Sequence, residues 1–261
     1  KPNKRMLKPN IPINNISMKI LHILLTILIS LGTLPAISNQ YNVYSPNNFN
    51  DAIKQENQKE RILFILDLSN SMEEPLENST KFNLMINTMS QILPQISPDT
   101  WIGLRVYGQR MGFTPLEACR ASSLISPINS NNNQNIENAL KKTKPRGMTP
   151  ITYSLKQAIK YDFMGFSGKK HIILLTDGGE NCDESPCTFV MNLIKIRRDV
   201  RIDVIAFNIN DSEDLEQLEC TALVTSGKFY NAQTSAELLN GFNNSIDGVK
   251  NVEAKILLPN N

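Results

Sequence analysis

Asp67, Ser69 and Ser71 are the residues whose type and spacing most directly predict chemistry in this chain. They follow residues 61–66, an apolar run whose length and β-branched content predict a buried central strand. The pattern Asp-x-Ser-x-Ser therefore places one carboxylate and two hydroxyls at the carboxyl end of a strand. In open α/β sheets this edge is where ligands bind. Hard oxygen donors gathered there suit a divalent cation such as Mg²⁺ or Mn²⁺.

Two further stretches supply oxygen donors beside predicted sheet elements. Thr149 precedes Pro150 and a helical pattern at 151–159, and Asp177 follows a second buried-strand pattern at 171–176. Each donor also has an ordinary structural interpretation, because Ser, Thr and Asp often cap helices or end strands, and Pro suits the first helical position. Their order across three separated segments favours one shared site instead.

The elements that must position these residues alternate along the chain. Patterns predict strands at 61–67, 101–107, 122–128, 171–176, 202–207 and 228–230. They predict helices at about 82–93, from 136, and at 151–161, 189–198, 211–225 and 235–249, the last capped by Ser235. This alternation predicts an α/β fold with a doubly wound, mostly parallel central sheet flanked by helices and joined by right-handed crossovers.

The ordered set of motifs closely resembles the von Willebrand factor A (VWA) domain over about residues 60–245. The resemblance implies a VWA/Rossmann-like fold with a metal-ion-dependent adhesion site formed by Asp67, Ser69, Ser71, Thr149 and Asp177. It implies that the two serines bind the metal through their hydroxyls and that Thr149 donates when ligand is bound. The two aspartates would act largely through waters. Mg²⁺ is the expected ion, with Mn²⁺ or Ca²⁺ as alternatives.

The resemblance also implies a function. Members of the family typically complete the metal's coordination with a Glu or Asp side chain of a protein partner. The stretches 177–182 and 186–187, with their cysteines, resemble a bacterial exported subgroup. Asn70 and Met148 stand where many relatives have Gly, but neither change removes a donor. We therefore expect an exported, metal-dependent, adhesion-type protein-binding module.

Two other functions are alternatives to a protein-binding module. A membrane-anchored structural or assembly subunit of an envelope complex would use the same fold. A metal-assisted hydrolase would need an activated water and a general base. His171 is the only histidine after the leader and lies at the start of a predicted buried strand, and no Ser-His-Asp or Cys-His arrangement is apparent. We expect no enzyme and no catalytic residues.

The N-terminal region predicts export. Residues 1–38 read as a leader with a signal peptide at about 18–38, in which Met18-Lys19 precedes a short apolar core and Ala36-Ile37-Ser38 forms a cleavage site. The core is shorter than the roughly 20 residues that span a bilayer. The expected location is periplasmic, secreted or cell-surface, with an inner-membrane anchor as the alternative if the segment is retained. Residues 39–59 predict a linker, 60–249 the VWA domain, and 250–261 a tail in which residues 256–258 could add a strand.

The four cysteines, Cys119, Cys182, Cys187 and Cys220, are an even number in an oxidising context, which predicts disulfides. A zinc site is disfavoured because the chain has no CxxC pair. In the fold implied by the resemblance, the pairs Cys119–Cys182 and Cys187–Cys220 are favoured. The local pair Cys182–Cys187 is the main rival.

Charge argues against nucleic acid as a partner. The chain has 27 Lys plus Arg and 25 Asp plus Glu, but five of the basic residues lie before position 39. The remainder has 22 basic against 25 acidic residues, a net charge of −3. A slightly acidic body lacks the basic surface that phosphate backbones require. The expected partner is a protein presenting Asp or Glu, and a membrane only if the N-terminal segment is retained as an anchor.

Overall fold

The computed structural model describes residues 59–256, with side chains described through Ile246. All of these residues belong to one compact unit. The predicted leader, and the predicted linker up to residue 58, lie outside the described range. Within that range, no helix combines the length and apolar character needed to cross a membrane.

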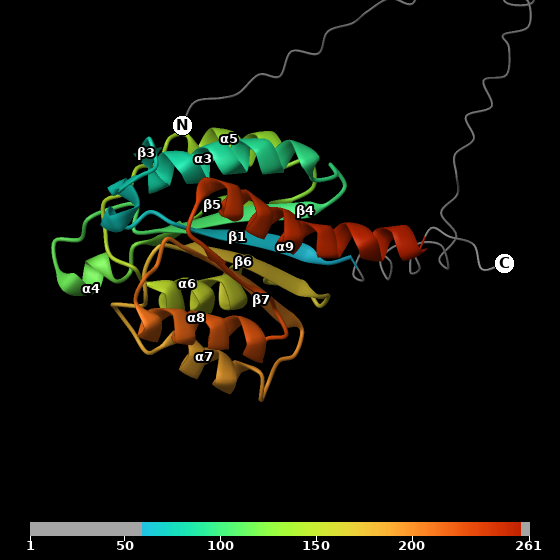
Figure 1. Ribbon diagram of the computed structural model, residues 1–261. Coiled ribbons are helices and arrows are strands. Elements are labelled where there is room, and N and C mark those ends of the chain that lie inside the picture. The colour runs from blue at the N-terminus through green and yellow to red at the C-terminus, as the bar shows by residue number, and fades with distance from the viewer. Residues whose placement is uncertain (1–58, 257–261) are drawn as a thin grey trace, which may run out of the picture. The chain divides into compact units, whose positions relative to one another are not determined.

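Six strands form the central sheet, in the spatial order β5-β4-β1-β6-β7-β8 (Figure 1). Neighbouring strands are parallel except β5, which is antiparallel to β4 and joins it through irregular register. This confirms the predicted mostly parallel, doubly wound sheet. The strands are β1 (Arg61–Asp67), β4 (Trp101–Tyr107), β5 (Ser122–Asn129), β6 (Lys170–Thr176), β7 (Val200–Phe207) and β8 (Phe229–Ala232).

The central strand β1 is apolar on both faces because both faces are covered. Ile62, Phe64 and Leu66 pack into one hydrophobic core, and Leu63 and Ile65 pack into the other. All five side chains are fully buried. Successive side chains of a strand point to opposite faces, so a strand between two helical layers carries a continuous apolar run. This is why the strand could be recognised from the sequence.

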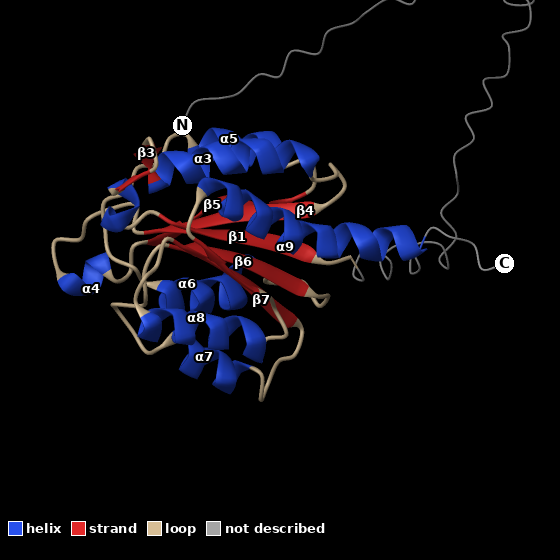
Figure 2. Cartoon of the chain, viewed as in Figure 1, coloured by secondary structure: helices blue, strands red, loops and turns tan. Residues whose placement is uncertain are grey.

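Helices cover both faces of the sheet (Figure 2): α3, α5 and α9 lie on one side, and α6, α7 and α8 on the other. The helices are α3 (Lys81–Ile92), α5 (Asn133–Leu140), α6 (Ile151–Gln157), α7 (Pro186–Leu193), α8 (Ser212–Val224) and α9 (Ser235–Ile256). Shorter elements are the 3₁₀ turns Asn70–Glu73 and Leu93–Gln95, the hairpin β2 (Pro75–Leu76) with β3 (Ser79–Thr80), α4 (Pro115–Ala118), and a π-helical turn, Ala158–Asp162, that continues α6.

Local capping explains where several helices begin. The hydroxyl of Thr80 accepts a hydrogen bond from the backbone N–H of Asn83 and starts α3. The carboxylate of Asp211 accepts one from the N–H of Asp214 and starts α8, which confirms the predicted cap. Capping by polar side chains is therefore the signal that made the start of α8 predictable.

The start of α9 differs from the prediction by one residue. Thr234, not Ser235, accepts the hydrogen bond from the N–H of Glu237. Ser235 instead donates its backbone N–H and its hydroxyl to the carboxylate of Glu77. The helix also runs to Ile256, into the predicted tail. Ile256 is therefore helical, and the proposed extra strand does not begin there.

Helix α7 spans Pro186–Leu193, so it begins three residues and ends five residues earlier than predicted. Pro186 occupies the first turn, where its missing N–H costs no hydrogen bond. The helix stops at Leu193, whose carbonyl accepts the N–H groups of Ile196 and Arg197 in a tight turn. That turn directs the chain into β7, and the apolar Ile196 is left exposed.

Candidate functional site

The candidate site lies at the topological switch point of the sheet. Strands β1 and β6 are neighbours, yet the chain leaves β1 toward β4 on one side and leaves β6 toward β7 on the other. Asp67 is the last residue of β1, and Asp177 follows the last residue of β6. Their carboxylates therefore meet at the crevice where open α/β sheets bind ligands.

Asp67 is fully buried and anchors the loop that follows β1. Its Oδ1 accepts the backbone N–H of Ser69 at 2.7 Å. Its Oδ2 accepts the hydroxyls of Tyr107 at 3.0 Å and Thr176 at 2.9 Å. With both oxygens engaged, Asp67 holds the ends of three adjacent strands together and fixes the turn that carries the serines.

Ser69, Ser71 and Asp177 bring three oxygens to one point. The hydroxyl of Ser71 donates to Oδ1 of Asp177 at 2.7 Å, and the two serine hydroxyls lie 2.9 Å apart. The hydroxyl of Ser69 lies 3.4 Å from the same Oδ1. The serines belong to one loop and the aspartate lies 106 residues later than Ser71, so the fold assembles this oxygen cluster.

Lys81, the first residue of α3, supplies a cation on the other side of Asp177. Its ammonium lies 3.1 Å from Oδ2 of Asp177 and 2.8 Å from Oε2 of Glu74, and only 5% of its side chain is exposed. Burial alone would lower the pKa of Lys81, but the hydrogen bonds and charges of Glu74 and Asp177 outweigh it and raise the pKa. Lys81 is therefore charged, and Asp177 presents Oδ2 to the ammonium and Oδ1 to the hydroxyls.

Thr149 lies on the adjoining loop and is 5% exposed. Gly147 pairs with Ser69 in an isolated parallel β-bridge, and its carbonyl accepts the N–H of Asn70 at 3.0 Å. These contacts hold the Thr149 loop against the serine loop. Asn181 binds Thr149 twice: its Oδ1 accepts the backbone N–H at 2.9 Å, and its Nδ2 donates to the hydroxyl at 3.3 Å. Thr149 is thus held beside the oxygen cluster by Asn181 and makes no hydrogen bond to the cluster itself.

The electrostatics of the site favour a bound cation. Burial and the negative charge of Asp177 raise the pKa of Asp67 to about 7, despite hydrogen bonds from Ser69 and Thr176 that lower it. Two buried carboxylates repel each other unless positive charge compensates them. Lys81 compensates one side of Asp177, and a cation beside Oδ1 and the serine hydroxyls would compensate the other.

The donor set suits a hard cation. The described part of the chain has no group of three or more His, Cys, Asp or Glu side chains placed to hold a metal. The converging donors are instead hydroxyls and one carboxylate oxygen, which fit Mg²⁺ or Mn²⁺ better than a soft metal. The residues present therefore fit a divalent cation held by few charged ligands.

The cysteines form two disulfides, as predicted. Cys119 pairs with Cys182, with 5.2 Å between Cα atoms, and Cys187 pairs with Cys220 at 5.4 Å. The first ties the segment after α4 to the loop after Asp177, and the second ties α7 to α8. No cysteine is free, so the pairing Cys182–Cys187 and a cysteine zinc site are both excluded.

A serine, a histidine and an aspartate do come together elsewhere, but not as a catalytic triad. Asp203 lies between the other two: its Oδ2 accepts the hydroxyl of Ser245 at 2.8 Å and is 3.1 Å from Nε2 of His171. All three side chains are fully buried. The serine is bonded to the carboxylate and not to a base, so the group stabilises the core between β6, β7 and α9, as expected for His171.

Comparison with known proteins agrees with this geometry. The family model described as the von Willebrand factor type A domain matches residues 62–244. The chain belongs to the VWA domain family. Two curated Bacillus subtilis (strain 168) proteins, both called uncharacterized, are similar to this chain. YwmC is 27% identical over 181 residues, covering 68% of this chain and 78% of that protein, and YwmD is 26% identical, covering 71% and 84%.

Solved structures share the VWA fold. Proximal thread matrix protein 1 from the mussel byssus, in a structure with a zinc-occupied MIDAS motif, has a TM-score of 0.56 at 23% identity. The pilus adhesin SpaC from Lactobacillus rhamnosus GG has a TM-score of 0.58 at 14% identity. The matches cover 72% and 74% of this chain but only 45% and 30% of those chains. At these identities, the likeness establishes the fold.

Sequence reasoning missed several residues that bond to the members of the candidate site. Lys81, Tyr107, Thr176 and Asn181 all bond to predicted donors. Lys81 carried a usable signal, because a cation in the first turn of a helix opposes the helix dipole and suggests another partner. The other three are ordinary strand-end or loop residues, and only the folded register brings them to the site.

Proposed function

We propose that this protein is an exported, metal-dependent protein-binding module. In this proposal a divalent cation, Mg²⁺ above all, lies beside Ser69, Ser71 and Asp177. The cation binds an Asp or Glu side chain of a partner protein. The observation that carries the proposal is the convergence of these three oxygens at the switch point of the sheet, with Lys81 opposite.

Each residue has a defined role in the proposal. Ser69 and Ser71 would hold the ion through their hydroxyls, and Thr149 would add a third hydroxyl when the partner binds. Asp67 and Asp177 would act through waters, balancing charge and holding the loops. With few charged ligands, the ion keeps affinity for an external carboxylate, which is the chemistry it supplies.

Adhesion and matrix proteins among the structural neighbours support a binding role over catalysis. The two disulfides support an oxidising compartment, such as the periplasm or the cell surface. The membrane-anchored assembly subunit remains the alternative within the same fold. It depends on residues 1–38, which lie outside the described range.

Proton relaxation of water bound to Mn²⁺ tests the proposal. Mn²⁺ bound to the protein should enhance relaxation, and N-acetyl-aspartate amide should reduce that enhancement as its carboxylate displaces a water from the ion. N-acetyl-asparagine amide, the matched neutral probe, should not. Absence of enhancement, or an equal response to both probes, would contradict the proposal.

A further inference from the structure

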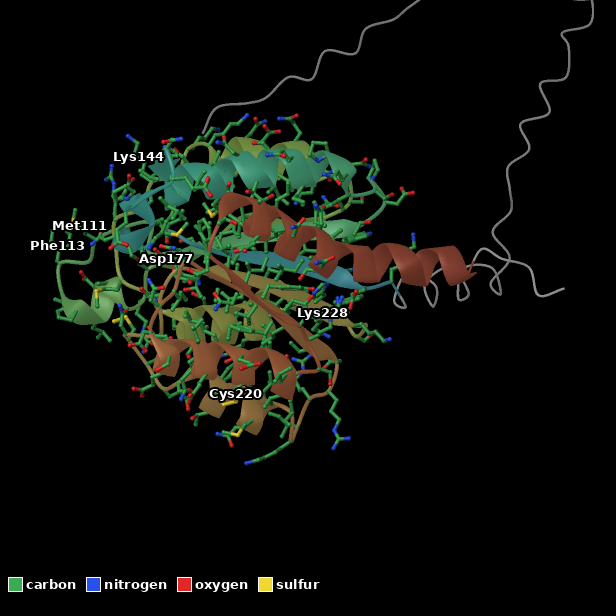
Figure 3. All side chains as sticks on the ribbon, viewed as in Figure 1. Met111, Phe113, Lys144, Asp177, Cys220 and Lys228 are labelled. Atoms are coloured by element: carbon green, nitrogen blue, oxygen red, sulfur yellow. A yellow bond between two sulfur atoms is a disulfide. The ribbon has the colours of Figure 1, made fainter. Side chains whose placement is uncertain are left out.

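An exposed apolar loop lies beside the candidate metal site. Between β4 and β5, residues 109–118 form what we call the apolar loop, in which Met111 is 74% exposed, Leu116 is 67% exposed and Phe113 is fully exposed. Met148, next to Thr149, is also at the surface. Figure 3 shows Met111 and Phe113 at the same end of the domain as Asp177. Large apolar side chains grouped at one surface mark interaction sites.

The apolar loop is anchored to the metal-site loops at both ends. At its start, the carbonyl of Gly108 accepts the N–H of Arg146 at 3.0 Å. Gly147 packs so tightly there that an added Cβ would lie 2.7 Å from the carbonyl oxygen of Arg110. At its end, Cys119 is bonded to Cys182 in the loop after Asp177. The loop therefore keeps a defined position relative to the metal donors.

Internal hydrogen bonds hold the loop in shape. The carboxylate of Glu117 accepts the backbone N–H of Phe113 at 2.8 Å, and the hydroxyl of Thr114 accepts the N–H of Glu117 at 3.2 Å. Gly112 lies against α4, where a Cβ would come within 2.2 Å of the N atom of Ala118. The backbone is thus ordered by its own contacts, while the apolar side chains of Phe113 and its neighbours face outward. A backbone that is already ordered loses little further entropy on binding.

Exposed basic residues lie in and beside the apolar loop. Arg110 is in the loop, and Lys144 and Arg146 are in the segment that leads to Thr149; all three are exposed. Among the described residues, none of the three side chains forms an ion pair. Figure 3 shows Lys144 at the same end as Met111 and Phe113. The one acidic residue within the loop, Glu117, is engaged with the backbone of Phe113.

We propose that the apolar loop is the second half of the partner-binding surface. The partner is an acidic protein segment whose Asp or Glu reaches the metal ion, while an apolar side chain close to it in sequence packs against Met111, Phe113 and Met148. Arg110, Lys144 and Arg146 attract the remaining acidic residues. This inference rests on the proposed function, because the metal site supplies the first contact.

A random 12-residue peptide library displayed on phage tests this surface. The purified, oxidised protein selects peptides in Mg²⁺, and the recovered sequences should combine Asp or Glu with Phe, Leu or Ile within a few residues. Binding of a recovered synthetic peptide should weaken at least about tenfold in Phe113→Ser and further in Met111→Ser/Phe113→Ser. Lys144→Glu should weaken it most at low salt.

Ile196→Ser is the matched control, because Ile196 is 82% exposed but follows α7, near the amino end of β7, at the opposite edge of the sheet. It should change affinity by less than about twofold, which is within the range of an energetically neutral contact. Each variant's thermal midpoint is compared with wild type, since the substituted side chains are exposed and should leave folding unchanged.

The outcomes separate this inference from the proposed function. Peptides that need Mg²⁺ but bind Phe113→Ser normally would contradict a role of the apolar loop in binding and would agree with the metal site. Peptides that need Phe113 but bind equally well in the presence of a chelator would agree with the loop as a docking surface. They would contradict its coupling to a bound metal. Recovery of no sequence combining carboxylate and apolar residues would overturn the inference. So would metal-independent binding to vesicles of phosphatidylcholine and phosphatidylglycerol that Phe113→Ser abolishes, which would assign the loop to a lipid surface.

Discussion

At the scale of single residues, the site balances two buried carboxylates against one buried ammonium. Asp67 and Asp177 are both largely removed from water. Of the four oxygens of these two carboxylates, Lys81 contacts only Oδ2 of Asp177. The hydroxyl of Ser71 donates to the other oxygen of Asp177, Oδ1, and the hydroxyl of Ser69 lies 3.4 Å from it. When Asp67 is ionised, the metal-free site carries more negative than positive charge, and this excess suits a divalent cation.

Lys81→Met should destabilise the metal-free protein. Removing one member of a buried ion pair leaves the other charge uncompensated, which costs about 3–5 kcal/mol. Bound Mg²⁺ would compensate Asp177 in its place, so the loss should be smaller in saturating Mg²⁺. Urea unfolding in EDTA and in Mg²⁺ measures the difference. Lys141→Met, which breaks an exposed pair with Glu137, is the control and should cost less than about 1 kcal/mol in either condition. An equal loss with and without Mg²⁺ would show that Lys81 does not share its role with a metal.

The raised pKa of Asp67 predicts an unusual pH dependence for the metal-free protein. Between its ordinary pKa of 3.8 and its folded value of about 7, the folded state holds a proton that the unfolded state has released. The contribution of Asp67 to the free energy of unfolding therefore falls as pH rises through this window, by at most about 1.4 kcal/mol per pH unit. Mg²⁺ requires the carboxylate, so its addition should reduce or reverse this slope.

Asp67→Asn provides the comparison for the pH prediction, because it removes the titrating group. Urea unfolding at pH 5.5, 6.5 and 7.5 in EDTA should show a flatter profile for the variant than for wild type. If the two profiles run parallel, Asp67 does not titrate in this window.

At the scale of elements, the two disulfides have different consequences. The bond Cys119–Cys182 closes a separation of 63 residues and joins the apolar loop to the loop after Asp177. The bond Cys187–Cys220 closes a separation of 33 residues and joins two helices away from the metal donors. Both restrict the unfolded chain, but only the first holds loops of the candidate site.

Replacing each pair of cysteines by serine separates these effects. Each double variant should lose about 2–4 kcal/mol of unfolding free energy. Only Cys119→Ser/Cys182→Ser should also weaken Mg²⁺ binding, because it frees the loop that carries Asp177 and Asn181. Chemical unfolding and calorimetric titration measure the two quantities. Equal loss of Mg²⁺ affinity in both double variants would contradict a local role for the first bond.

The elements also show what could be predicted from sequence. The strands β1 and β6 were predictable because burial on both faces demands unbroken apolar runs such as residues 62–66. The start of α8 was predictable because Asp211 is a strong cap. The boundaries of α7 and α9 were misplaced because tertiary contacts, such as that of Ser235 with Glu77, decide them. The four-residue helix α4 and the β2–β3 hairpin are too short to produce a periodic signal.

The candidate site was predictable to a similar degree. Asp67, Ser69, Ser71 and Asp177 could be grouped because each follows a recognisable strand, and parallel strands end at one edge. The involvement of Asn181 with Thr149, and of Tyr107 with Asp67, depends on how loops and neighbouring strands pack. Local sequence patterns do not contain that information.

At the scale of the whole molecule, one end of the domain collects the features that a binding protein needs. The oxygen cluster, the apolar loop and the basic residues Arg110, Lys144 and Arg146 belong to segments at the carboxyl ends of the parallel strands or to loops anchored to them. The sheet and its two helical layers serve as a rigid support. This arrangement predicts that binding is lost through local changes at this end while the fold remains intact.

The most direct test of the account is calorimetric titration of Mg²⁺ into the purified, oxidised protein, with Ser71→Ala and Ser97→Ala in parallel. Ser71 donates to Asp177, whereas Ser97 is exposed on the segment that leads into the amino end of β4. The account predicts saturable binding by wild type and Ser97→Ala, and binding weakened at least about tenfold in Ser71→Ala, the loss expected for one ligand contact. No saturable binding by wild type, or equal affinity in all three proteins, would contradict the central claim that these oxygens form a metal site.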